Sequence, residues 1–271
     1  CPDWPGCYGH LTVGEAVQNA ERANAAYPDR PLEADKAFKE MVHRYLAAAL
    51  GLLIVVIAAI AFRNRHNRAQ PVRLPAALVL LVVFQGLLGM WTVTLLLKPA
   101  VVSAHLLGGL TTMSLLWWLA LPSRPQHSRG EKQRLRTWSV IGLLVLAAQI
   151  SLGGWVSTNY AALACPDFPT CQLSYWPEMD FRDAFVLWRG LGIDYEGGVL
   201  DHPARVAIHY THRLGAIVAA VVLGWLAWLA IRQGRSSAMR SSGVALALVL
   251  ALQLILGPTM VLKTLPLPLA T

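Results

Sequence analysis

Six long apolar stretches alternate with shorter polar segments along the chain. Each is long enough to cross about 30 Å of hydrocarbon, which takes roughly 20 residues of α-helix. An open sheet or irregular backbone cannot satisfy its hydrogen bonds in lipid, and no alternating pattern typical of barrel strands is present. The pattern therefore predicts an all-α membrane protein with six transmembrane helices in this chain. The predicted spans are 37–62, 74–97, 101–121, 137–157, 204–231 and 242–263.

The composition and the placement of charge agree with a membrane protein. The chain is 55% hydrophobic and 14% charged, with a mean hydropathy of +0.47. A net charge of +8 could indicate a nucleic-acid partner, but 12 of the 23 Lys and Arg residues lie at 63–73, 124–136 and 232–240, between apolar stretches. Cytoplasmic loops of membrane proteins are enriched in Lys and Arg. We therefore expect no nucleic-acid partner, a multi-pass protein of the cell inner membrane surrounded by lipid, and the remaining connections on the outer, periplasmic side.

The chain contains two tandem copies of one unit. Three pairs of motifs recur in the same order at offsets of 164 to 169 residues. Both copies of each motif occupy the same side in the predicted topology, so we expect parallel repeats related by an axis along the membrane normal. The expected repeats are residues 1–136 and residues 137–271. The matched motifs are Cys1–Cys7 with Cys165–Cys171, His43-Arg44 with His212-Arg213, and Gln85 and Gly89 with Gln253 and Gly257.

Four of the eight histidines, His43, His105, His209 and His212, lie within predicted membrane helices. An ionisable side chain is costly there and indicates a functional site. His43, His105 and His212 each lie about one to two turns from the outer end of a helix. Two imidazoles at one depth on different helices can bind both axial positions of a haem iron, and His43 with His105 is the natural pair in the first repeat. The alternative is that the histidines join helices by hydrogen bonds.

Glu40 precedes His43 by three residues, so the two side chains share one face of a helix. A carboxylate there can accept a proton beside a bound cofactor. The alternative is an interfacial acid paired with Lys39 or Arg44. The repeat offset places His209 where Glu40 would recur. This difference predicts a catalytic first half and a supporting second half.

Arg44 and Arg213 follow the repeated histidines, and a guanidinium pairs well with the carboxylates of haem propionates. The alternative for both arginines is that they extend toward lipid headgroups. Gln85 and Gln149 each precede a glycine by four residues, which favours close helix packing.

The four cysteines form two pairs with the same spacing, Cys1 with Cys7 and Cys165 with Cys171. Each pair shares a short loop on the predicted outer side, where disulfides persist. We therefore predict two disulfides. They are structural by default, although a disulfide near a redox cofactor could also exchange electrons.

These motifs together resemble the haem A synthase family over nearly the whole chain. The resemblance rests on the cysteine loop that starts at Cys1, Glu40 to Arg44, His105 to Gly109, and His209 to Arg213. The family is a bundle of eight helices in two halves that oxidises the C8 methyl group of haem O to the formyl group of haem A by successive hydroxylations, for cytochrome oxidase assembly.

The resemblance implies that His43 and His105 bind the iron of haem O, with Arg44 beside them, and that Glu40 assists the oxidation. In the second half His212 would bind the iron of a haem b cofactor, with His209 and Arg213 nearby. The disulfides would serve electron transfer or stability. Haem O synthase and cytochrome oxidase assembly factors would be candidate partners, a homo-oligomer would be compatible, and a eukaryotic relative would lie in the mitochondrial inner membrane.

The chain differs from the family in having six predicted spans instead of eight. We therefore expect a fragment, with the second ligand of the cofactor haem two residues beyond Thr271 in the repeat register. Two other functions remain open: a bis-histidine b-type cytochrome that only carries electrons, which would have little use for Glu40, and a transporter built of tandem repeats.

Overall fold

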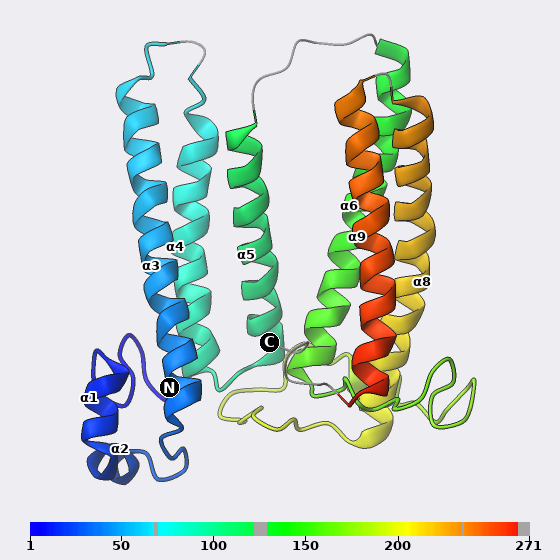
Figure 1. Cartoon of the computed structure of the whole chain (residues 1–271). Helices are drawn as coiled ribbons and strands as arrows, with labels where there is room; N and C mark the ends of the chain where they lie inside the picture. Colours follow the sequence, from blue (N-terminus) through cyan, green and yellow to red (C-terminus); the bar gives the residue numbers. More distant parts are fainter. Residues whose placement is uncertain (68–69, 122–128, 235, 265–271) are drawn as a thin grey trace. The chain divides into compact units, whose positions relative to one another are not determined.

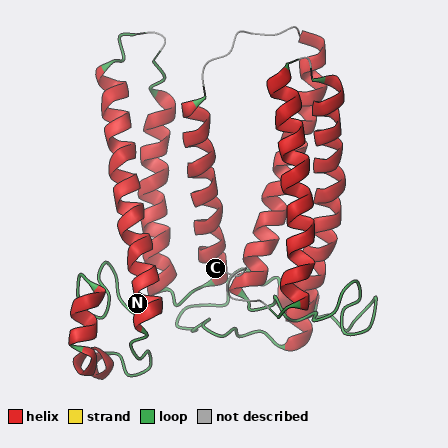
Figure 2. Cartoon of the chain, viewed as in Figure 1, coloured by secondary structure: helices red, strands yellow, loops and turns green. Residues whose placement is uncertain are grey.

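The computed structural model of the chain describes residues 1–67, 70–121, 129–234 and 236–264. In this part of the chain the regular secondary structure is helical (Figure 2). Six helices are long and apolar enough to cross a membrane, which confirms the predicted fold class. These are α3 (Ala34–Arg63), α4 (Arg73–Thr94), α5 (Pro99–Ala120), α6 (Arg129–Thr158), α8 (His202–Gln233) and α9 (Ser237–Leu262). The short helices are α1 (Val13–Gln18), α2 (Ala20–Ala26) and α7 (Phe181–Ala184).

The helix ends differ from the predicted spans for local reasons. Helix α4 ends at Thr94, three residues before the predicted end, because Leu96 and Leu97 adopt positive φ angles of 54° and 59°. A left-handed backbone cannot continue a right-handed helix. Pro99 then opens α5 at its first turn, where the missing N–H of proline costs nothing. The side chain of Ser236 accepts a hydrogen bond from the Met239 nitrogen and caps α9.

The chain divides into two compact units, whose residues can be located by the colours of Figure 1. Unit 1 holds α1 to α5 together with residues 190–194. Within it α4 packs against both α3 and α5, and α1 packs against α3. Residues 190–194 are tied to this unit by polar contacts. The buried Lys98 amine donates to the Gly190 carbonyl, and Arg30 Nη2 lies 2.8 Å from Asp194 Oδ2.

Unit 2 holds α6 to α9. Helix α8 is its centre, because α6, α7 and α9 all pack against it. Small residues allow this close packing: Ala207, Ala219 and Ala227 on α8 are all buried. Division into residues 1–136 and 137–271 as functional halves stays a prediction.

Many large apolar side chains of the long helices are exposed, including Leu53, Trp118 and Leu248. In water such a surface would be unfavourable, but the acyl chains of a bilayer cover it without cost. The protein is therefore a multi-pass membrane protein, and its polar groups inside the helices require a separate explanation.

Candidate functional site

His43 on α3 and His105 on α5 lie side by side in unit 1. Their ring centres are 6.3 Å apart, and the ring planes meet at 67°. Both helices pack against α4, which holds them as neighbours. The structure thus brings together the two histidines that the sequence pairs.

The spacing of the two rings fits a shared iron atom. With metal–nitrogen bonds of about 2 Å, two opposed axial imidazoles have ring centres about 6 Å apart. His105 Nδ1 is buried and makes no hydrogen bond of normal geometry within the described residues, although the Gln85 carbonyl lies near the ring. Gly89 faces the same ring, with only 3.4 Å between an ideal Cβ and His105 Cε1. The donor set therefore suits a haem iron held between α3 and α5.

Glu40 lies one turn before His43 and forms an ion pair with Arg44. Its Oε1 accepts from Arg44 Nη2 at 2.5 Å, and its Oε2 accepts from the main-chain nitrogen of Cys1 at 2.6 Å. The pairing with Arg44 is the alternative that the sequence left open for this acid. The carboxylate is about one-third exposed, so a proton acceptor at this position remains accessible.

Arg44 also binds the first cysteine loop, residues 1–7. Its Nη1 donates to the carbonyl oxygens of Asp3, Pro5 and Gly6, at 3.1, 3.2 and 2.5 Å. The Cys1–Cys7 disulfide closes this loop. The guanidinium therefore links the loop to the helix that carries His43.

Arg213 binds the second cysteine loop, residues 165–171, in the same way in unit 2. Its Nη1 donates to the Thr170 carbonyl at 2.8 Å, and its Nη2 donates to the carbonyls of Cys165 and Asp167, at 2.8 and 2.9 Å. The Cys165–Cys171 disulfide closes this loop, so both predicted disulfides are present and no described cysteine is free. Interaction of the two arginines with haem propionates stays a prediction.

His212 lies on α8 beside the repeated arginine. Gln149 Nε2 on α6 lies 3.1 Å from His212 Nδ1 and 3.1 Å from the His212 carbonyl oxygen. His209, one turn earlier, is buried, and its Nδ1 lies 3.0 Å from the Ala161 carbonyl. This contact occupies one ring nitrogen of His209. The Nε2 of His212, in contrast, makes no hydrogen bond to any residue that the structure describes.

Comparison with known proteins identifies the family of this chain. The profile of the COX15-CtaA family, described as cytochrome oxidase assembly protein, matches residues 1–271. The chain belongs to this family. It is 43% identical to a protein of Shewanella oneidensis named heme A synthase, over all of this chain and 81% of that protein. It is also 29% identical to the heme A synthase of Caulobacter vibrioides, over 89% of this chain and 70% of that protein.

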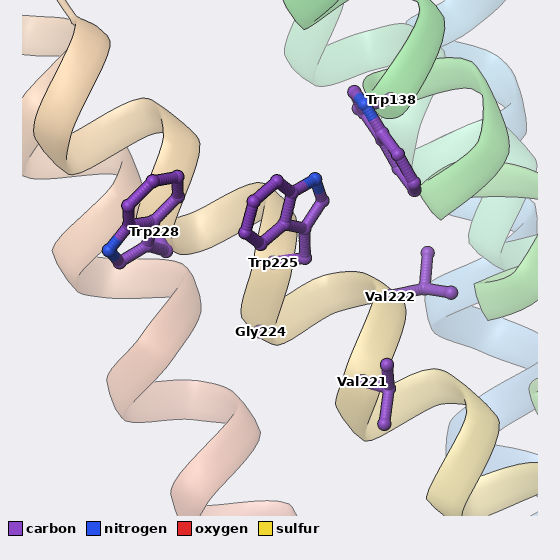
Figure 3. Close-up of a pocket in the computed structure, with 6 residues that line it drawn as sticks. All are labelled: Trp138, Val221, Val222, Gly224, Trp225 and Trp228. Carbon is purple, nitrogen blue, oxygen red and sulfur yellow. The ribbon is translucent and has the colours of Figure 1, made fainter.

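A groove in this family member lies away from the histidines, on the surface of α6 and α8 (Figure 3). Trp225 stacks on Trp228 with ring centres 4.7 Å apart, and Trp138 meets Trp225 edge-on. Trp225 is 13 residues from His212 along α8, which corresponds to about 20 Å. The groove is therefore separate from the candidate haem site, and its tryptophans suit a membrane interface.

Two features of the site were not predicted from the sequence. Gln149 was interpreted as a residue of close helix packing, whereas its side chain contacts His212. The arginines were interpreted as partners of propionates or headgroups, whereas both bind cysteine loops. The shared His-Arg order beside each loop was the pattern that could have indicated the second feature.

Proposed function

We propose that the protein is a haem A synthase, an enzyme that oxidises the C8 methyl group of haem O to a formyl group by successive hydroxylations. The observation that carries this proposal is the pair of His43 and His105 rings with Glu40 one turn away. Membership of the family and the names of the relatives support it. The residues of unit 1 supply what a reaction on a bound haem needs: two iron ligands and an acid–base group.

His43 and His105 bind the substrate iron from opposite sides and so fix the orientation of the haem O ring. Glu40 accepts protons that leave the methyl carbon as it is oxidised. For this the carboxylate must exchange its partner Arg44 for the substrate, which is easier for a partly exposed ion pair than for a buried one. Arg44 remains next to the substrate through its bonds to the first cysteine loop.

His212 would provide one iron ligand for a haem b in unit 2, with His209 and Arg213 around it. Such a haem supplies one-electron transfer when it is bound. The cysteine loops lie on the outer face of the membrane in this proposal, because the basic connections are at the opposite ends of the helices. Haem O synthase and oxidase assembly factors are the proposed partners.

Pigment analysis tests the function directly. The protein is produced in cells that make haem O but lack their own haem A synthase, and extracted haems are separated by chromatography. Haem A, together with its hydroxymethyl precursor, is the expected result. Haem b alone would identify an electron-carrying cytochrome and would overturn the proposal, as would purified protein without any haem.

A further inference from the structure

Two glutamines lie beside haem-site histidines, each on a neighbouring helix and each packed over a glycine one turn beyond the histidine. In unit 2, Gln149 on α6 reaches Nδ1 of His212 on α8 at 3.1 Å. Its amide lies over Gly215, one turn beyond His212, where any Cβ would overlap the amide. Gly153, one turn beyond Gln149, faces the His212 ring, with 3.3 Å from an ideal Cβ to Cε1. The four residues pack closely, and a side chain at 153 or 215 would require the His212 ring or the Gln149 amide to move.

Unit 1 repeats this arrangement on α4 and α5. The Gln85 amide lies over Gly108, one turn beyond His105, and Gly89 faces the His105 ring at 3.4 Å. Gln85 Nε2 and His105 Nδ1 are both buried, and neither makes a hydrogen bond of normal geometry within the described residues, although the Gln85 carbonyl lies near the His105 ring. Buried polar atoms without such partners are costly, which points to a function.

The internal duplication does not explain the match. The repeat offset relates Gln85 to Gln253 on α9 and not to Gln149 on α6. The same arrangement of a glutamine, a histidine and two glycines therefore occurs on helices that are not equivalent in the repeat. What the two places share is a histidine assigned to iron.

The chemistry of a metal-bound imidazole accounts for such a neighbour. A histidine that binds a metal through one nitrogen carries its proton on the other, and that N–H usually needs an acceptor that fixes the ring. A glutamine amide offers an oxygen and a nitrogen at nearly the same place and reverses them by rotating its terminal bond. In this structure Gln149 Nε2 faces His212 Nδ1 and donates to the His212 carbonyl, while Oε1 is buried over Gly215 without a partner. Rotation of the amide brings Oε1 to an Nδ1–H in exchange for the bond to the carbonyl.

We infer that Gln149 and Gln85 are positioning residues that hold His212 and His105 with Nε2 directed to iron, each by accepting a hydrogen bond from Nδ1–H when haem is bound. The neutral amide, in contrast to a carboxylate, orients the imidazole without adding negative charge to it. This inference rests on the proposed haem ligation.

The test compares variants of the full protein, purified in detergent, by haem b content and by redox titration of that haem. Gln149→Leu should retain haem b about 10- to 100-fold less tightly, as expected when a partner of a metal ligand is lost. Gln149→Glu should keep its haem at a lower midpoint potential, because a carboxylate makes the imidazole a stronger donor to ferric iron. Ser151→Ala, two residues away on α6, should match wild type in both measurements, since its hydroxyl donates to the Ala147 carbonyl of its own helix.

Gln85→Leu tests the first haem site independently of the second. It should weaken haem O binding in a titration of substrate without changing the potential of haem b. Unchanged potential and haem content in both Gln149 variants would overturn the inference while leaving the synthase proposal intact. Equal potentials for Gln149→Leu and Gln149→Glu would also overturn it, because a packing role does not distinguish charge. Wild-type protein without haem b would remove the proposed cofactor together with the inference.

Discussion

Replacement of Arg213 by lysine should open the second cysteine loop. The guanidinium holds three loop carbonyls, those of Cys165, Asp167 and Thr170, at 2.8 to 2.9 Å. A lysine amine keeps the charge but lacks the planar fork that reaches several acceptors at once. Arg213→Lys therefore loses two of the three hydrogen bonds.

The free energy lost in Arg213→Lys depends on how far the guanidinium and the loop are buried. A hydrogen bond to a charged donor contributes about 1.5 to 3 kcal/mol. The loop is partly exposed, so water replaces part of each lost bond, and we take the lower limit for two bonds, about 3 kcal/mol. This corresponds to an increase of about 100-fold in the open population of the loop. If the disulfide is reduced only in the open loop, its rate of reduction rises by the same factor.

The assay is reduction of Cys165–Cys171 in membranes by a water-soluble phosphine, followed by thiol labelling and peptide mass spectrometry. The Cys1–Cys7 disulfide in the same molecule is an internal control, because Arg44 and not Arg213 holds its loop. Arg182→Lys is a matched control, because the Arg182 side chain is exposed on α7. Equal reduction rates in Arg213→Lys and wild type would refute the structural role of the guanidinium.

Three further predictions concern the loops and the acid. Labelling of unreduced protein should detect no free thiol, and four labelled thiols would contradict both disulfides. Glu40→Gln should bind haem O but make little haem A, because the amide cannot accept a proton; near-normal haem A output would reduce Glu40 to an interfacial acid. Hydrogen bonds from the Thr170 hydroxyl and from the main chain hold the pKa of Asp167 below its usual 3.8. Ionised Asp167 therefore stabilises the closed loop at pH values above 3.8, and this stabilisation is lost as the pH falls through the lower pKa that Asp167 has in the folded protein. Reduction of the second loop should accelerate in wild type below roughly pH 4, whereas Asp167→Asn should already be fast at pH 7 and change little.

The six helices were predictable because lipid imposes one rule on every residue of a span. An apolar run of sufficient length has no other stable structure in a bilayer. Helix ends were less predictable, since the end of α4 depends on the left-handed angles of Leu96 and Leu97, which an apolar run does not reveal. The pairing of His43 with His105 followed from their shared depth together with their place in the first repeat, since His212 at the same depth belongs to the second repeat.

The contacts of Gln149 and the arginines could not be predicted in this way, because they depend on the rotation of each helix about its axis. Sequence gives the depth of a residue, but close packing between α6 and α8 decides that Gln149 meets His212. Close helix packing and the contact with the histidine depend on each other here. Gly215 leaves room for the Gln149 amide, and this amide contacts the His212 ring.

The repeated His-Arg order gains a physical meaning from the cysteine loops. With 3.6 residues per turn, neighbouring side chains on a helix point about 100° apart. When Arg213 is fixed on the second cysteine loop, the rotation of α8 is fixed at that depth, and with it the direction of His212. Arg44 imposes the same constraint on α3 and His43 through the first cysteine loop. A lysine would leave the helix freer to rotate, and a shift of the arginine by one residue would turn the histidine away. This constraint explains why loop, histidine and arginine recur together in both units, whereas Glu40 and His209, one turn earlier, are free to differ.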